Sequence, residues 1–459
     1  MQNKGCAIAM KEAEFDINEL FFSITDYAST IVAGNEVFVR ISGYEKSEII
    51  GKFHNIIRHP DMPKIIFKTF WDFLKAEKPI VAYVKNKTKE GGYYWVLAAV
   101  FPMNGRYISI RIKPNSSIFP IIRELYFKLL MAESKAETDV EVLLEALLKE
   151  QGFNSYEEFM SHALLAELIE RKKILTTKAS EQKDTLQIHS KVMECLDGLL
   201  ENSNFIMYRY EKWFDKIALF DRVKETFAEK GVTLRHLARD IVFLSLNASV
   251  ASYKVASGGE TFGVLASDVR VNAKENDILI TKIDLLAQSL SGLLNKMIFS
   301  VSAIRIQIEM MTYFIREVLY QETDVDSFDL AENLEILREL VASYTLKLSE
   351  LQSQMDDNIQ ESLKGLTSLE QQVMYLGYIQ VYGIIEAAGY QDETIGFGGI
   401  FSQLKDLIRR TSDEIVVMQK MGEDFSAENQ GLIHELLSIV NVISEMQKTT
   451  KKIKSVVVA

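Results

Sequence analysis

The chain has 459 residues and a formal net charge of −12, with 47% apolar and 25% charged residues. This composition is ordinary for a folded protein of several domains, and the acidic balance argues against nucleic-acid binding, which requires a basic surface. The two cysteines, Cys6 and Cys195, lack CxxC spacing, so neither a disulfide framework nor a cysteine-based metal site is favoured. The longest apolar run, residues 93–101, is far shorter than the roughly 20 residues of a membrane helix, so we expect a cytoplasmic protein without a membrane span.

The first 120 residues differ in kind from the remainder. They carry a charge of +4 against −16 for the rest, and they contain all six prolines. Short β-prone runs separated by turn residues predict strands at 21–26, 27–34, 80–88, 93–102 and 106–114, with a hairpin turn at 90–92. An amphipathic pattern predicts a helix at 64–77. Residues 1–115 are therefore expected to form an α+β domain, with a five-stranded antiparallel sheet and short helices.

The stretch HNIIRHPDMPK, residues 54–64, is the densest group of chemically active side chains. His54, His59 and Asp61 could ligate a metal, or one histidine a haem. A structural zinc site needs four ligands, and no further His or Cys lies nearby in sequence, so no metal site is predicted. No GxSxG, P-loop or HExxH motif accompanies the stretch, so the sequence predicts no catalytic residues and no enzyme. In a purely structural alternative, Asp61 caps the helix that follows.

No proline follows position 120, so the remaining residues can form long uninterrupted helices. Residues 116–185 are expected to form a helical connector. Beyond it, apolar residues recur at alternating spacings of four and three, which is typical of a coiled-coil seam. One seam comprises Leu330, Leu334, Leu337, Val341, Tyr344, Leu348, Leu351 and Met355, and a second runs from Leu279 through Leu286 and Leu293 to Met311.

Two interruptions of the helical tract, residues 254–266 and 389–401, align without a gap when Phe262 is placed over Phe397. The arms on either side, at about 190–255, 262–320, 328–389 and 397–459, are nearly equal in length. Equal arms joined by sharp turns predict a long antiparallel four-helix coiled-coil bundle of two hairpins, residues 186–325 and 326–459. A single chain would then form the bundle as a monomeric pseudo-dimer, with a homodimer as the alternative.

The segment LARDIVFLSLNASVASYKVASGGETFGVLASDVR, residues 237–270, resembles the signalling hairpin of methyl-accepting chemotaxis receptors. In that family the hairpin tip binds a histidine kinase and its coupling protein, so the resemblance implies these partners or other chemoreceptors. The family pattern is not kept at residues 240–242, nor at Ala251, although Glu386 retains the equivalent glutamate in the second hairpin. The tip residues that the resemblance implies are Asn247, Lys254, Phe262, Arg270, Glu386 and Phe397.

Residues 35–103 resemble the PAS domain of bacterial aerotaxis receptors, mainly through HNIIRHPDMPK and YYWV. In that family the domain binds FAD, whose redox state is sensed. The resemblance implies a soluble redox or oxygen sensor for aerotaxis or energy taxis. The alternatives are a non-catalytic interaction adaptor, whose PAS domain is empty or holds another ligand, and a PAS sensor for haem or another ligand whose output is not the chemotaxis kinase. The implied flavin-binding residues are Arg58, His59, Asp61 and Trp71, with His54, Asn55 and Asn86 as further candidates.

Overall fold

The computed structural model describes residues 11–135, 139–178, 191–253, 259–320, 327–389 and 396–458. The chain forms two compact units. The first comprises Met1–Phe214, Ile298–Leu348 and Leu436–Ala459, and so contains the sheet domain, the connector and one portion of each long helix. The second comprises Asp215–Met297 and Ser349–Glu435, which are the remaining portions of the same four helices.

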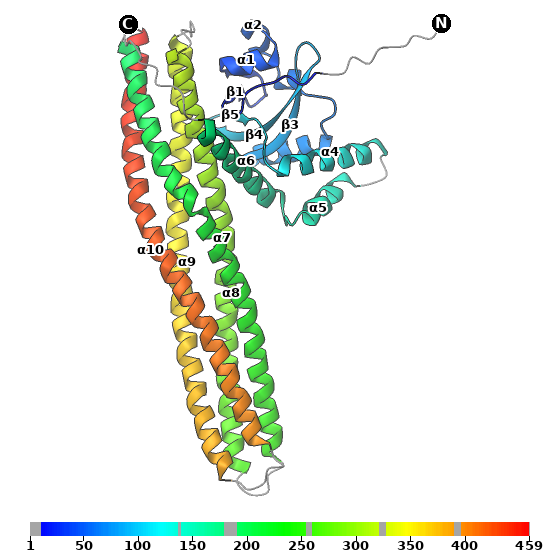
Figure 1. The fold of residues 1–459 in the computed structure, drawn as a ribbon, viewed down its shortest axis with the longest axis vertical. Helices are drawn as coiled ribbons and strands as arrows, with labels where there is room; N and C mark the ends of the chain where they lie inside the picture. The colour runs from blue at the N-terminus through cyan, green and yellow to red at the C-terminus, as the bar shows by residue number, and fades with distance from the viewer. Residues whose placement is uncertain are drawn as a thin grey trace. The chain divides into compact units, whose positions relative to one another are not determined.

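The sheet has five antiparallel strands in the order β2-β1-β5-β4-β3. The strands are β1 (Phe21–Asp26), β2 (Ile31–Gly34), β3 (Ile80–Lys87), β4 (Tyr93–Met103) and β5 (Arg106–Ile112). All five predicted strands are confirmed (Figure 1). β2 begins later than expected, because residues 27–29 turn and Ser29 adopts a φ of 69° that a strand does not accommodate.

Four short helices follow β2 and precede β3 in sequence. They are α1 (Glu36–Ser42), α2 (Lys46–Ile49), the 3-10 helix η1 (His54–Ile57) and α3 (Lys64–Lys75). The helix predicted at 64–77 is thus confirmed. The alternative in which Asp61 caps α3 is wrong, because Pro63 occupies the cap position without a side-chain bond. The Asp61 carboxylate instead accepts a hydrogen bond of 2.8 Å from Lys85 on β3.

Successive residues of a strand point to opposite faces of a sheet. One face of this sheet, which we call the polar face, is directed toward η1 and α3 and carries Ser23, Asn86, Ser109 and Arg111. The opposite face packs on the helices that follow in sequence. In the first unit, the ring of Phe22 meets Phe314 at 5.2 Å, and Phe101 meets Tyr344, also at 5.2 Å. The sheet therefore lies between η1 and α3 on one side and the long helices on the other.

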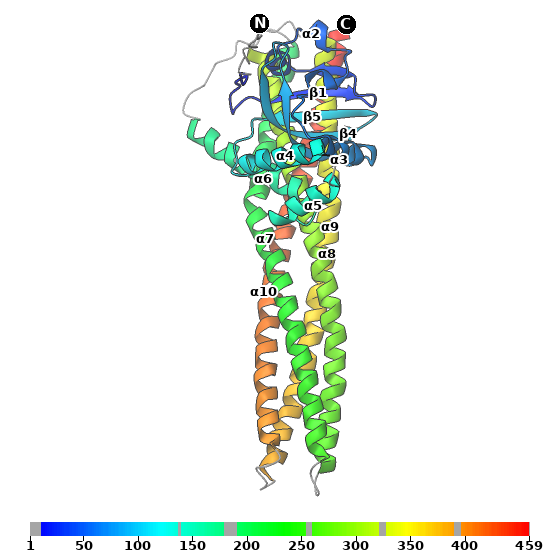
Figure 2. The same ribbon diagram turned by 90° about the vertical axis from the view of Figure 1, so that its right-hand side faces the viewer.

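The connector consists of α4 (Ile118–Lys135), α5 (Val140–Glu150) and α6 (Tyr156–Lys178), shown in Figure 2 beside the sheet. Two buried charged residues of α6 fasten it. Glu167 accepts hydrogen bonds from the Tyr83 hydroxyl at 2.8 Å, from the backbone nitrogens of Asn115 and Ser116 at 2.6 and 2.9 Å, and from the Ser116 hydroxyl at 2.8 Å. Arg171 donates to Glu309 at 2.6 Å. The connector is thus bonded both to the sheet and to a long helix.

The four long helices are α7 (Lys191–Ser252), α8 (Gly259–Tyr320), α9 (Ser327–Ala388) and α10 (Phe397–Val458), and each has 62 residues. They pack as a bundle, which confirms the predicted fold class. Of the described helices, Glu260–Tyr320 is long and apolar enough to cross a membrane, but 89% of its most apolar window is buried within the protein. The core helix of a bundle has the same composition, so this apolarity is explained by packing.

The first seam is buried as predicted, apart from the half-buried Leu351. The second seam is partly wrong. Leu279, Leu286 and Leu293 are only half-buried, while the residue after each of them, Ile280, Ala287 and Leu294, is buried. The apolar stripe of α8 is wider than a heptad seam. Heptad spacing alone therefore selected residues at the edge of the stripe rather than at its centre.

In the second unit, Phe262 and Phe397 stack on each other, with ring centroids 3.9 Å apart and planes 9° apart. Both rings are buried in a cluster drawn from all four helices. These are the two phenylalanines on which the internal repeat aligns. The repeat therefore brings its own equivalent positions into contact, as expected for two similar hairpins related by a pseudo-two-fold axis.

Replacing Phe262 by leucine is expected to lower the free energy of unfolding of the second unit by about 1 kcal/mol, because apolar burial is kept and the ring stack is lost. Hydrogen exchange of the α8 amides near residue 262 would show this. Phe243→Leu is the matched control, since Phe243 lies on the adjacent helix and is exposed. Equal effects of the two substitutions would contradict a specific role for the stack.

Candidate functional site

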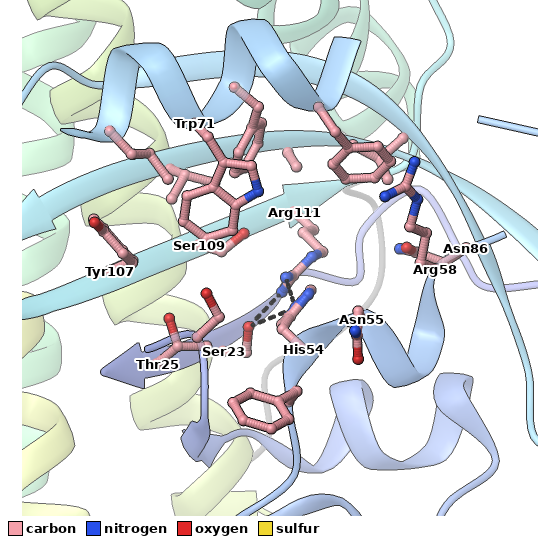
Figure 3. A pocket seen from close by; sticks show the side chains of 18 of the residues that line it. Ser23, Thr25, His54, Asn55, Arg58, Trp71, Asn86, Tyr107, Ser109 and Arg111 are labelled. Carbon is pink, nitrogen blue, oxygen red and sulfur yellow. Dashed lines mark hydrogen bonds between the residues drawn. The ribbon is translucent and has the colours of Figure 1, made fainter. Parts of the chain in front are cut away.

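The polar face of the sheet and the helices η1 and α3 enclose a cavity of about 320 Å³ (Figure 3). Small-molecule sites typically range from about 300 to 1,000 Å³, so this cavity could hold a planar ring system. Its walls are mainly apolar and aromatic, with Phe67, Phe70 and Trp71 contributed by α3. Phe53 is exposed at its edge.

A buried arginine lies at one end of this cavity. Arg111 of β5 is 2% exposed and donates to the Ser23 hydroxyl at 3.0 Å and to Nε2 of His54 at 2.6 Å. No Asp or Glu among the described residues forms an ion pair with it. Burial lowers the pKa of Arg111 only to about 10, so the guanidinium stays positively charged at neutral pH. Buried charges are normally paired, so this cation is unusual unless a ligand accompanies it.

His54 is held neutral beside this cation. Burial, and then the charge of Arg111, lower the pKa of His54 to about 3. Its ring is half-buried by accessible surface because it borders the cavity, although protein atoms surround it. Since Nε2 accepts the Arg111 hydrogen bond, the ring proton resides on Nδ1. The end of the cavity therefore presents one positive charge and no negative one from these side chains.

Two further polar groups border the cavity without partners. Within the described part of the chain, neither Nδ2 of Asn86 nor Oγ of Ser109 has a hydrogen-bond partner, and both residues are buried. Burial raises the pKa of the hydroxyl of Tyr94, which lies opposite Asn86 on β4, and the charge of Arg111 and then the Asn86 amide partly oppose this rise. No hydrogen bond of normal geometry joins Tyr94 and Asn86. Unsatisfied buried donors are costly, so these groups suit a polar ligand.

Of the seven residues implied by the aerotaxis-receptor resemblance, five border the cavity, namely His54, Asn55, Arg58, Trp71 and Asn86. The guanidinium of Arg58 lies 4.0 Å from the centre of the Phe67 ring.

His59 and Asp61 do not border the cavity. His59 is buried, accepts a hydrogen bond at Nδ1 from the Asp61 backbone at 3.1 Å, and packs edge-on against Tyr93. Asp61 pairs with Lys85, whose hydrogen bond lowers the pKa of the Asp61 carboxyl. Both residues therefore shape the turn that leads into α3, and their role in binding stays a prediction.

Sequence reasoning missed Ser23, Tyr107, Ser109 and Arg111. The signal was present in RYISIRI, residues 106–112, where Tyr107, Ser109 and Arg111 alternate with isoleucines. Alternation at period two places all three on one face of the strand. That face is the one that borders the cavity.

No group of three or more His, Cys, Asp or Glu side chains suited to a metal occurs in the described ranges. His54 borders the cavity and His59 does not, so the two histidines of residues 54–64 do not converge on one site.

The implied tip residues lie on the second unit. Asn247 and Arg270 are exposed, Glu386 is half-buried, and Lys254 lies outside the described residues. Near them, each hairpin exposes three apolar side chains at positions related by the repeat. These are Phe243, Leu246 and Val250 on α7, and Tyr378, Val381 and Ile385 on α9. Exposed apolar stripes of this kind are typical of protein interaction surfaces.

Residues 31–111 match the family model described as PAS fold. The sheet domain is a PAS domain. Over 109 residues the chain is 41% identical to the aerotaxis receptor of Escherichia coli (strain K12). The matched region covers 23% of this chain and 22% of that protein. The chain therefore matches about a fifth of the length of this curated relative.

Two solved structures are also similar to the PAS domain. The LOV domain of the blue-light activated histidine kinase of Erythrobacter litoralis EL346 is 13% identical, with a TM-score of 0.20, over 20% of this chain and 94% of that domain. The PAS domain of the fruit-fly ELK potassium channel is 18% identical, with a TM-score of 0.19, over 20% of this chain and 85% of that one.

Proposed function

We propose that this protein is a non-enzymatic cytoplasmic sensor, in which the PAS domain binds FAD and reports redox state or oxygen through the helical bundle. The observation that carries the proposal is the buried, unpaired cation of Arg111 at the end of an apolar cavity. The identity of 41% to an aerotaxis receptor over the same domain supports it.

The residues present fit a flavin. The unpartnered groups of Asn86 and Ser109 would hydrogen-bond the polar edge of the ring, and Trp71 would pack against the ring plane. Arg58, which borders the cavity, would contact the diphosphate of the cofactor. A bound flavin supplies a group that takes up electrons and can thereby gain negative charge. Arg111 binds a negatively charged group more tightly than a neutral one, so this chain would distinguish the two states.

The pocket has a short route to the helices. Ser23 accepts a hydrogen bond from Arg111, and its neighbour in β1, Phe22, packs on Phe314 of α8 across the sheet. A change at Arg111 that moves Ser23 would therefore displace a residue in contact with a long helix. Such a relay requires two states whose packing differs, with ligand affinities that follow them.

The absorption spectrum of the purified full-length protein tests the cofactor. We expect the protein to show a flavin spectrum or to bind added FAD. Asn86→Leu is expected to weaken the binding of FAD about tenfold or more. Lys87→Leu is the matched control on the same strand, because Lys87 does not border the cavity. A protein that stays colourless with FAD would overturn the flavin proposal and favour the adaptor alternative. A Soret band would identify haem instead.

For the output, we propose that the apolar stripes at 243–250 and 378–385 contact the chemotaxis kinase, its coupling protein or other chemoreceptors. Sedimentation at several concentrations would distinguish the monomeric pseudo-dimer from a homodimer. A pull-down with these components in oxidising and reducing conditions tests the partner, and binding that Tyr378→Lys leaves unchanged would contradict this surface.

A further inference from the structure

A glutamate from the bundle is buried against the PAS domain within the first unit. Glu317 of α8 is 5% exposed, and its Oε2 accepts a hydrogen bond of 2.9 Å from Nδ2 of Asn35. Its Oε1 has no hydrogen-bond partner in the part of the chain that the structure describes. An ionised carboxylate in this position lacks much of the solvation that water would provide, and such burial is costly.

Asn35 joins this carboxylate to the first strand of the sheet. It is itself buried, its Oδ1 accepts from the Phe22 backbone nitrogen at 3.1 Å, and its Nδ2 also donates to the Leu20 carbonyl at 3.2 Å. Phe22 in turn packs edge-on against Phe314, one turn before Glu317 on α8. The side chain of Glu317 is therefore part of the contact that holds β1 on the helix.

The charges around Glu317 do little to stabilise its ionised form. The carboxylate of Glu36 opposes ionisation, while the backbone nitrogens of Glu36 and Val37 favour it without reaching normal hydrogen-bond geometry. Tyr313, one turn earlier on α8, lies near Glu317 and also near Glu19 and Arg40 of the PAS domain.

The cations of this interface have other partners. Arg40 pairs with Glu19, and Arg171 of α6 pairs with Glu309. Among the residues that the structure describes, none forms an ion pair with Glu317. Burial, the largest contribution, raises the pKa of Glu317 to about 7.

We propose that Glu317 is a proton-dependent latch, through which the PAS domain docks on α8 more tightly when the carboxyl is protonated than when it is ionised. The latch does not require any cofactor. When the contact opens, the carboxyl returns to water and to its ordinary pKa of 4.5. Docking is then strongest below this value, weakens as the pH rises toward about 7, and is constant above it.

Hydrogen exchange of the full-length protein tests the latch at residues 21–26 and 36–42. After correction for intrinsic exchange rates, protection at pH 5.5 is expected to exceed protection at pH 8 by about thirtyfold, which follows from the two pKa values. Glu317→Gln keeps the oxygen that accepts from Asn35 but cannot titrate, so it should remove this pH dependence and retain protection at pH 8.

Glu332→Gln is the matched control, because Glu332 also joins the bundle to the PAS domain but forms a partly exposed ion pair with Arg106. This variant should keep the wild-type pH dependence. The proposal is overturned if the wild type shows less than about a threefold effect, or if Glu317→Gln keeps the wild-type profile. The wild-type profile decides by itself if the variant fails to fold. Since no flavin enters the measurement, its outcome is independent of the cofactor proposal.

Discussion

Replacing Arg111 by methionine is expected to stabilise the ligand-free protein by about 1–2 kcal/mol while weakening the binding of FAD by about tenfold to a hundredfold. The stability gain follows because methionine fills a similar volume without a buried charge. The groups left behind, the Ser23 hydroxyl and Nε2 of His54, lie 3.4 Å apart and can bond to each other. The loss of binding follows because a charge-assisted hydrogen bond to the ligand disappears.

Opposite changes in stability and binding would distinguish a ligand-binding charge from a structural one. Chemical denaturation measures the first quantity and a titration with FAD the second. Arg106→Met is the control on the same strand, since the side chain of Arg106 is partly exposed and pairs with Glu332. Its effect on either quantity should be small. Destabilisation by Arg111→Met with unchanged FAD binding would assign Arg111 to the core alone.

Replacing Glu167 by alanine is expected to lower the free energy of unfolding of the first unit by about 3–4 kcal/mol. Glu167 is 1% exposed and accepts four hydrogen bonds, from one tyrosine, one serine and two backbone nitrogens. Its removal leaves these buried donors unsatisfied. Because the bonds join α6 to β3 and to the start of α4, the connector should separate from the sheet before the sheet itself unfolds.

Glu157→Ala, on the same helix, is the control. Its carboxylate pairs with Lys78 in a geometry where both side chains are more than half exposed, so its loss should cost less than about 0.5 kcal/mol. Denaturant titration monitored by Trp95 fluorescence is suitable, because that indole packs on Phe119 of α4 at 5.4 Å. A Glu167→Ala variant as stable as Glu157→Ala would show that the buried carboxylate does not hold the connector.

The fold was largely predictable from sequence because its signals are local. Proline confinement separated the sheet domain from the long helices, and short β-prone runs between turn residues placed each strand to within a few residues. The equal arms predicted helices whose lengths proved identical. The errors concern individual residue positions within the helices. The heptad rule chose Leu279 over the buried Ile280, because a wide apolar stripe satisfies more than one register.

The candidate site was only partly predictable because it is assembled from distant segments. Trp71 and Arg58 belong to the recognisable motif region, but Arg111 is brought to Ser23 by the pairing of β1 with β5. The alternation in residues 106–112 places Arg111 on one face of a strand but does not tell which residues lie opposite it. The contact of Glu317 with Asn35 was even less predictable from sequence. The two residues are 282 positions apart, and only the packing of α8 on the sheet brings them together.

The stack of Phe262 on Phe397 has a consequence for how the two hairpins can change in sequence. Because both hairpins belong to one polypeptide, their pairing in the monomer is intramolecular and would not weaken on dilution. In addition, a substitution in one hairpin is not copied into the other, as it would be in a homodimer. Ala251 in the first hairpin and Glu386 in the second already differ at equivalent positions. The two hairpins can therefore diverge independently in sequence.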